Sequence, residues 1–307
     1  MSKIATRMAY GEALCDLGEK YDFIVMDADL SGSTQTGMFA KKFPERFFNC
    51  GIAEQNMLSV AAGIASTGKP VFVSSFAMFA VGRAYEQIRN SVCYPGLNVK
   101  ICASHAGVTV GEDGATHQYC EDLSVLRSVP HLTVVSPADA VEAYAAIEAV
   151  LKHDGPVYVR LGRYAVPTVF DKATYKFELG KAVPLCEGDD CVVFATGVMV
   201  AAALEARDIL AKEGINISVV NVHTLKPIDV DTIVKYAKKT GKVVTAEEHT
   251  TVGGLGGAVA EVLSEHCPTL MRRVGLRDRF GRSAPAGELL DRYGLNAQGI
   301  IDAIKSF

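Results

Sequence analysis

The sequence has no tryptophan, no Cys-x-x-Cys pair among its eight cysteines, and no apolar run long enough to span a membrane. Cysteines such as Cys102 and Cys191 lie in apolar runs. We therefore expect their thiols to be reduced and packed in the core of a cytosolic protein. The first residues do not resemble a signal peptide, and a formal net charge of −4 argues against a polyanionic partner. These absences predict a cytoplasmic protein that binds neither a membrane nor a nucleic acid.

The chain does contain 307 residues, 49% of them apolar, which is enough for two domains with sizeable cores. Short apolar strands alternate with helical patterns, and this alternation predicts parallel sheets covered by helices on both faces. The strands expected in the first half are 23–26, 71–73, 99–103, 132–135 and 157–161, and those in the second half are 191–195, 217–222 and 242–246. We therefore predict an α/β protein with two domains, each a mostly parallel sheet flanked by helices.

The alternation weakens between residues 165 and 188, which indicates a linker together with an edge segment. The predicted first domain is 1–170, the linker is 171–188, and the second domain is 189–307. A glycine-rich turn at 247–257 lies between a strand and a helix of the second domain. Its spacing differs from the dinucleotide-binding fingerprint, so we expect a tight turn at an interface.

One helical stretch, 51–65, carries a single ionisable side chain, Glu54, among apolar and small residues. A helix with so little polar surface is expected to be buried on most sides. A carboxylate is seldom buried unless it is paired or hydrogen-bonded, so Glu54 is a candidate functional residue. The alternative is a charge that only stabilises the start of the helix.

A second candidate segment is the loop 104–118, which follows the predicted strand 99–103. It contains His105, His117, Glu112, Asp113 and three glycines. Ligands of open parallel sheets bind beyond the carboxyl ends of strands, and glycines allow the backbone to approach a ligand closely. Two histidines beside acids in this position favour a site over a mobile surface loop.

The segment Gly-Glu-Asp-Gly-Ala-Thr-His-Gln at 111–118 resembles the transketolase signature, and Gly-Ile-Ala-Glu-Gln at 51–55 is similar to the family's glycine-x-x-glutamate segment. Further similar segments follow in the family's order at 29–33, 134–139, 219–229 and 247–249. The resemblance covers nearly the whole chain and only the C-terminal half of a transketolase. It implies a pyrimidine-binding domain followed by the small C-terminal domain.

The resemblance also implies roles for residues that match the family's thiamine diphosphate site. Glu54 matches the glutamate that hydrogen-bonds the pyrimidine ring and promotes the imino tautomer that removes the thiazolium proton. Phe76 and Phe79 match aromatics that hold the pyrimidine, and ordinary core packing is the alternative, more so for Phe76 than for Phe79. Glu54 and His117 are the predicted catalytic residues.

Substrate contacts are implied in the same way. His105, Asp113 and His117 resemble the family's contacts to substrate hydroxyls and phosphate. Positions that bind the phosphate of a sugar phosphate are matched by Arg7, Ser33 and Arg163, and a guanidinium suits phosphate because it can bind two oxygens at once. For Arg7, an ordinary surface position remains an alternative.

The other half of a transketolase carries a Gly-Asp-Gly segment with a downstream asparagine, which hold Mg²⁺ and the diphosphate. We find no such segment here, since residues 187–190 lack the downstream pattern. The resemblance therefore implies that thiamine diphosphate and Mg²⁺ are shared with an N-terminal-half partner subunit that supplies the metal ligands. A dimer of such pairs is expected.

The predicted activity is transfer of a two-carbon ketol unit from a ketose phosphate to an aldose phosphate. One alternative is a deoxyxylulose-phosphate-synthase-like enzyme, which shares 111–117 but resembles an aspartate at the position of His105. A second is the beta subunit of a 2-oxoacid dehydrogenase, whose loop does not resemble 111–118. A third, a non-catalytic binding module, is disfavoured by the presence of both Glu54 and His117.

Overall fold

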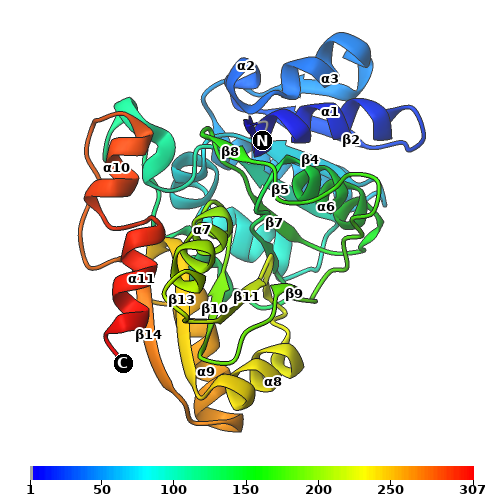
Figure 1. The fold of residues 1–307 in the computed structure, drawn as a ribbon. Helices are drawn as coiled ribbons and strands as arrows, with labels where there is room; N and C mark the ends of the chain where they lie inside the picture. Colours follow the sequence, from blue (N-terminus) through cyan, green and yellow to red (C-terminus); the bar gives the residue numbers. More distant parts are fainter. Residues whose placement is uncertain (1–2) are drawn as a thin grey trace.

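The computed structural model describes residues 3–307 and forms two stacked α/β units (Figure 1). The strands are β1 (Lys3–Ala5), β2 (Ile24–Asp27), β3 (Phe47–Asn49), β4 (Val71–Ser74), β5 (Val99–Ala103), β6 (Thr133–Val135), β7 (Val157–Arg160), β8 (Ala165–Pro167), β9 (Val183–Cys186), β10 (Cys191–Ala195), β11 (Ile217–Asn221), β12 (Thr224–Lys226), β13 (Lys242–Thr250) and β14 (Leu270–Leu276). The α-helices are α1 (Thr6–Gly18), α2 (Ser31–Thr34), α3 (Thr36–Lys42), α4 (Glu54–Ala65), α5 (Asp122–Arg127), α6 (Ala140–Lys152), α7 (Met199–Ala211), α8 (Val230–Thr240), α9 (Leu255–His266), α10 (Ala286–Arg292) and α11 (Ala297–Lys305). Two 3₁₀ segments, η1 (Pro44–Arg46) and η4 (Val108–Asp113), and two π-helical segments, η2 (Met78–Arg83) and η3 (Gln87–Cys93), complete the elements.

The first unit is built on a seven-stranded sheet in the order β12-β6-β7-β5-β4-β2-β3, parallel except for β12. Side chains alternate between its faces, as the pleat requires. Val25 and Phe72 share a core with residues of α1, α3 and α6, whereas Met26 and Val73 share one with residues of α4, η2 and α5. Helices thus cover both faces, and only the ends of the strands are left for a site.

The second unit repeats this plan with five strands in the order β14-β13-β10-β11-β9. Val193 and Ala195 pack with α7 and α11, while Val192 and Phe194 pack with α8 and α9. Only the edge strand β9 is antiparallel. This strand lies within 171–188, so the segment predicted as a linker with an edge segment contains a strand of the second sheet.

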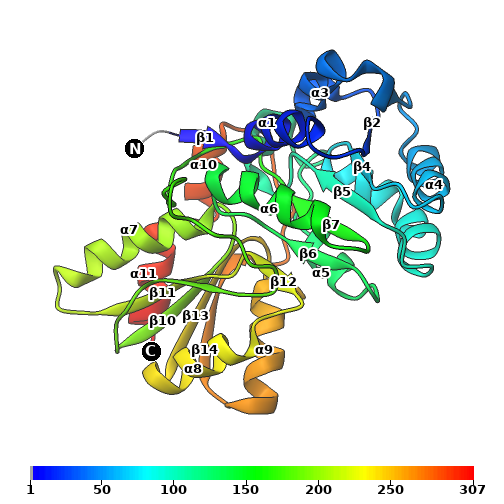
Figure 2. The same cartoon turned by 90° about the vertical axis from the view of Figure 1, so that its right-hand side faces the viewer.

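The two units interlock along one side (Figure 2). The short strand β12, which follows β11 of the second unit, pairs with β6 at the edge of the first sheet. Apolar side chains of both units belong to one continuous core, from Ile101 and Tyr158 to Phe194 and Val220. The predicted fold class is confirmed, and the two sheets are held together by a shared strand pairing as well as by packing.

The helix α4 is less enclosed than its composition suggested. Met57, Leu58 and Ala61 are buried, but Gln55 and Val60 on the other side are exposed. The expectation of burial on most sides was wrong, because small residues such as glycine and alanine do not report which face of a helix is covered. One face of α4 is therefore open beside Glu54.

Two other departures concern the helices. The pattern of apolar residues over 80–92 is typical of one helix, but the stretch consists largely of the π-helical segments η2 and η3. The structure also adds β14, α10 and α11 in the last forty or so residues, for which the sequence pattern predicted no element. A π-helical hydrogen bond spans one residue more than an α-helical one. It therefore changes the spacing of apolar residues by which a helix is recognised in a sequence.

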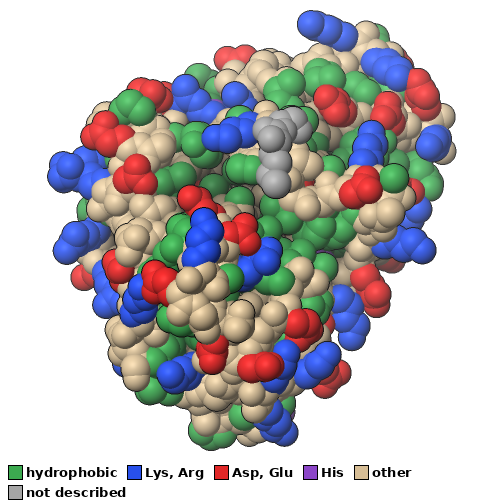
Figure 3. Space-filling view, in the orientation of Figure 1, with side chains coloured by type: hydrophobic (Ala, Val, Ile, Leu, Met, Phe, Trp, Pro, Cys, Tyr) green, Lys and Arg blue, Asp and Glu red, His purple; other side chains and the backbone are tan. Residues whose placement is uncertain are grey.

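The surface carries interspersed acidic and basic side chains on the face shown in Figure 3, in keeping with the small net charge. All eight cysteines are free, and Cys93, Cys102, Cys120 and Cys191 are buried. Among the helices of residues 3–307, none combines the length and the apolar character that crossing a membrane requires.

Candidate active site

The predicted site residues lie mainly on loops that follow the parallel strands of the first sheet. Ser33 follows β2, Phe76 and Phe79 follow β4, His105 follows β5, and Arg163 follows β7. Because these strands run in the same direction, their carboxyl ends meet at one edge of the sheet. Sequence segments up to 130 residues apart are thereby brought to one place.

Glu54 is the first residue of α4 and only 1% of its surface is exposed. Its Oε2 accepts a hydrogen bond from Nη1 of Arg83 at 2.9 Å, and its Oε1 lies 3.4 Å from the donor hydroxyl of Ser75. Arg83 comes from the last position of η2, a π-helical segment of the kind that often occurs at functional sites. The buried carboxylate is therefore both paired and positioned at the start of a helix.

Aromatic rings connect Glu54 to the histidine loop. The guanidinium of Arg83 covers the ring of Phe79 at 4.8 Å from its centroid. Phe79 in turn meets His117 edge-on at 5.3 Å, and Phe76 stacks on His105 with ring centroids 3.7 Å apart. These contacts place a carboxyl group, two phenyl rings and two imidazoles in one continuous cluster.

His105 is held in an unusual backbone conformation with φ of 58°, and only 2% of it is exposed. Burial, together with the charges of Arg7 and Arg163, lowers the pKa of His105 to about 3, so the ring is neutral near pH 7. Arg7 can only donate, so the Nε2 that it approaches at 3.4 Å is the unprotonated nitrogen. The proton then lies on Nδ1, 2.9 Å from the hydroxyl of Ser104.

Arg7, at the start of α1, reaches the loop after β2 by donating from Nη1 to the carbonyl of Ser33 at 2.8 Å. The contact uses the backbone of Ser33, which leaves its hydroxyl free of this bond. Asp27 organises the same loop by accepting from the amide of Leu30 at 2.6 Å and the hydroxyl of Thr34 at 2.7 Å. Burial raises the pKa of Asp27, while these hydrogen bonds favour its charged form.

Arg163, which follows β7, contacts the loop that carries the two histidines. It donates to the carbonyl of Val110 at 2.7 Å and lies 3.4 Å from the carboxylate of Asp113 and 3.9 Å from that of Glu112. It also acts electrostatically on Arg7 and His105, since its charge lowers the pKa of both. The structure thus brings both predicted arginines, Asp113 and the histidines to the same region as Glu54.

The sequence missed Arg83, the charge partner of Glu54. A buried carboxylate calls for a nearby cation or donor, and Arg83 follows Phe79 by four residues, a spacing at which helical side chains meet. A search for such a cation on the segment after Phe79 could have found it. Ser104, whose hydroxyl lies 2.9 Å from Nδ1 of His105, and Gln118 adjoin the two histidines in sequence and carry no separate signal.

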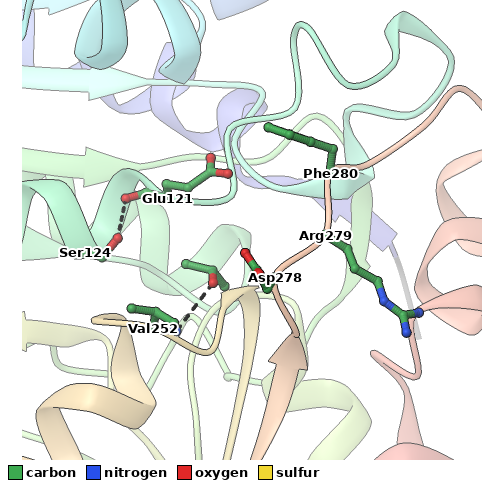
Figure 4. A pocket seen from close by; sticks show the side chains of 7 residues that line it. Glu121, Ser124, Val252, Asp278, Arg279 and Phe280 are labelled. Carbon is green, nitrogen blue, oxygen red and sulfur yellow. Dashed lines mark hydrogen bonds between the residues drawn. The ribbon is translucent and has the colours of Figure 1, made fainter.

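No group of three or more histidine, cysteine or acidic side chains suited to a metal ion occurs among residues 3–307. A cavity of about 300 Å³ at the junction of the two units contains none of the predicted residues (Figure 4). It is lined by Glu121, Ser124, Thr250, Val252, Asp278, Arg279 and Phe280. The candidate site is therefore the cluster around Glu54 and the histidines, at the open edge of the first sheet.

Comparisons with known proteins bear on the family of the chain. The family model described as the transketolase pyrimidine binding domain matches residues 2–168, and the model of the transketolase C-terminal domain matches residues 180–300. The chain belongs to the transketolase family. It corresponds to the pyrimidine-binding and C-terminal domains of a transketolase, as the sequence predicted.

Two relatives and one solved structure have nearly the same extent as this chain. A chain of Methanocaldococcus jannaschii provisionally named a transketolase C-terminal section is 51% identical, over 97% of this chain and 94% of that protein. The 6-deoxy-6-sulfo-D-fructose transketolase subunit SqwH of Clostridium sp. is 45% identical, over 97% and 92% respectively. A solved structure described as a split gene transketolase, an inactive beta4 tetramer, is 52% identical with a TM-score of 0.92, covering 99% of this chain and 98% of that one. This transketolase chain is therefore similar to a C-terminal section, a transketolase subunit and a split gene transketolase over nearly the whole length of each.

Proposed function

We propose that this chain is the C-terminal subunit of a thiamine diphosphate-dependent transketolase, which transfers a two-carbon ketol unit between a ketose phosphate and an aldose phosphate. The observation that carries the proposal is the buried carboxyl group of Glu54 within a cluster of Phe76, Phe79, His105 and His117. When bound, thiamine diphosphate supplies the carbon nucleophile that carries the two-carbon unit.

The residues present fit the pyrimidine part of that cofactor. The pyrimidine is a flat ring with polar nitrogens, so it needs an apolar surface to stack on and a group that can exchange a proton with a ring nitrogen. Phe79 offers a ring that is only partly buried, and Glu54 offers a carboxyl group already excluded from water. In this role Glu54 would hold or supply a proton at the ring nitrogen, while the phenylalanines orient the ring.

The two histidines are proposed to bind the sugar. His105 is neutral, which leaves one ring nitrogen able to accept and one able to donate, as hydroxyl recognition requires. His117 is half-buried beside Phe79, where it could contact the reacting part of the substrate. Asp113, held by Arg163, is proposed as an acceptor for further hydroxyl groups.

The anionic end of the substrate is proposed to lie near Arg7, Ser33 and Arg163. Burial and the nearby charge of Arg163 lower the pKa of Arg7, so the two guanidinium groups form a region of positive potential that an anion relieves. A phosphate is the first candidate. A sulfonate is a second, because the relative named a 6-deoxy-6-sulfo-D-fructose transketolase subunit is 45% identical to this chain.

A partner subunit is proposed to complete the site. Beside Glu54, apolar side chains of the segment 47–65 are exposed, namely Phe48 at 47%, Ile52 at 76% and Val60 at 41%. A cluster of exposed apolar groups at the edge of a site is typical of a surface that another chain covers. The expected occupant is an N-terminal-half transketolase subunit with the Gly-Asp-Gly segment, which would bring the ligands for Mg²⁺ and the diphosphate, in a dimer of such pairs.

The test is to measure ketol transfer by the chain with and without that partner, in the presence of thiamine diphosphate and Mg²⁺. We expect no transfer by the chain alone and restored transfer after mixing. Robust activity of the chain alone would contradict the need for a partner. Inactivity of the mixture, when the two proteins form a stable complex that binds the cofactor, would contradict the transketolase activity itself.

A further inference from the structure

The loop that carries Asp113 and His117 is fastened by one buried side chain, Gln118. Its Nε2 donates to the carbonyls of Val108 at 3.2 Å, Gly111 at 3.1 Å and Arg282 at 2.9 Å. Three carbonyl acceptors surround this atom, so it must be the amide nitrogen, since an oxygen there could accept from none of them. Two of the bonds close the loop on itself, and the third ties it to the C-terminal unit.

The segment that receives the third bond, 277–285, links β14 to α10 and packs directly against the loop. Figure 4 shows its beginning, from Asp278 to Phe280, beside Glu121 and Ser124 of the first unit. Gly281 leaves no room for a side chain, because a Cβ there would collide with Oε1 of Gln118. That oxygen is buried and has no hydrogen-bond partner among residues 3–307, so its own contact at this point is close packing against Gly281.

Two glycines of the loop lie against the segment 277–285. Gly114, with φ of 79°, faces Ser283 so closely that a Cβ would collide with the serine hydroxyl. Gly111, with φ of 85°, lies against the backbone of Ala284. Next along the chain, α10 packs on η4, as the position of this helix in Figure 1 shows. The segment 277–285 and the loop therefore pack closely against each other through these glycines.

The start of the loop is tied to the C-terminal unit as well. Oε1 of Glu248, in β13, accepts from the amide of Thr109 at 2.6 Å, and a Cβ on Gly107 would collide with the same carboxylate. Arg160 braces Glu248 by donating to its carbonyl at 3.0 Å. Both ends of the loop are thus fixed by the second unit, and Asp113 and His117 lie between these ends.

We propose that the C-terminal unit sets the position of the His117 loop, with Gln118 as a positioning residue and Gly281 as the backbone surface on which Gln118 rests. This inference rests on the proposed ketol transfer for its functional meaning. A displacement of a reacting group by about 1 Å can cost a hundredfold in rate, so a hydrogen bond outside the site has consequences within it. The second unit is then a part of the catalytic machinery through Arg282 and Glu248, although it supplies no catalytic side chain.

The first test is Gly281→Ala in the chain assembled with its partner, because the added methyl group displaces the Gln118 amide without touching the site. We expect kcat/KM for the sugar substrates to fall roughly ten- to a hundredfold, chiefly through kcat because His117 is displaced, while the affinity for thiamine diphosphate stays unchanged. The matched control is Gly287→Ala in α10, where an added Cβ meets nothing closer than 3.9 Å and wild-type kinetics are expected.

The second test is Gln118→Glu, which keeps the shape but removes both donors and places a carboxylate against three carbonyls. Besides kinetics, hydrogen exchange of the amides at 109–117 is measured by mass spectrometry in the chain itself, and faster exchange in both variants is expected. Wild-type kinetics with wild-type exchange would overturn the inference. So would equal losses of cofactor affinity, melting temperature and kcat/KM, since these would show general destabilisation. If the wild-type assembly transfers no ketol unit, the proposed function fails, and the exchange experiment still decides the positioning of the loop.

Discussion

Nη1 of Arg83 lies 2.9 Å from Oε2 of Glu54 in a pair whose two members differ greatly in exposure. The side chain of Glu54 is 2% exposed and that of Arg83 is 45% exposed. The arginine therefore remains hydrated on one side while it neutralises a carboxylate that water does not reach. Any ligand that contacts Glu54 from the open edge of the sheet does so beside this guanidinium.

The ion pair between Arg83 and Glu54 should contribute to the unfolding free energy of the chain without its partner. Arg83→Met leaves a buried carboxylate without its cation, so we expect unfolding to become easier by about 1–3 kcal/mol, less than for a fully buried pair because Arg83 is partly hydrated. In the Glu54→Gln background the same substitution should cost much less. Urea unfolding of the four chains in a double-mutant cycle measures the difference. Equal costs in both backgrounds would show that the two side chains do not stabilise each other.

Glu54→Gln should leave folding and assembly largely intact and reduce turnover of the assembled enzyme by about 10²-fold or more, because an amide cannot exchange the proton that a carboxylic acid can. Exchange of the thiazolium proton of the bound cofactor, followed by NMR, measures the step directly. An unchanged rate of thiazolium proton exchange in the variant would show that Glu54 is only a charge that stabilises the start of the helix.

Arg163→Ala should raise KM for a phosphorylated acceptor by roughly ten- to a hundredfold, since a charge-assisted hydrogen bond to phosphate contributes roughly 1.5–3 kcal/mol. A short aldehyde without phosphate should be nearly unaffected. Glu112→Gln is the control, because it weakens an exposed contact of Arg163 at 3.9 Å and leaves the guanidinium in place. Equal losses with both acceptors would mean that Arg163 acts only by bracing the loop through Val110 and Asp113.

A pH dependence of stability is expected from Glu142, a fully buried residue of α6. Burial raises the pKa of Glu142 to about 7, although Tyr175, Asn221 and the amide of Ala138 donate to its carboxyl group. The folded chain thus holds this proton more tightly than the unfolded chain, whose glutamate has a pKa near 4.5. The stabilisation is fully present below pH 4.5 and is lost as the pH rises through 7, by about 3 kcal/mol in total.

Glu142→Gln removes the group that binds this proton. The difference in unfolding free energy between variant and wild type should therefore change by about 3 kcal/mol between pH 4.5 and 7.5. Buried histidines such as His105 and His223, whose pKa values are lowered to about 3 and about 4, act in the opposite direction in both proteins and cancel in the difference. Denaturant unfolding at several pH values provides the measurement. A constant difference would show that Glu142 is ionised in the folded chain across this range.

The sequence predicted the parallel sheets, the helical stretch that carries Glu54 and the loop that holds His105 and His117, because apolar periodicity, strand ends and glycine-rich turns are local signals. The assignments of Arg7, Ser33 and Arg163 needed the family resemblance, since nothing local shows that three distant loops meet. Arg83 was missed because no charge partner for Glu54 was sought on the segment after Phe79. The partnership of Gln118 with Arg282 spans 164 residues, and no local pattern encodes a contact of that kind.

The short strand β12 has a consequence for how the molecule comes apart. It belongs by sequence to the second half and by hydrogen bonding to the first sheet, where it covers the edge of β6. A chain cut within 171–188 would bare that edge, and an uncovered strand edge recruits other strands into aggregates. The two family domains are separate in sequence, but the β12–β6 pairing joins them in the structure. We therefore expect a single cooperative melting transition in which both halves unfold together.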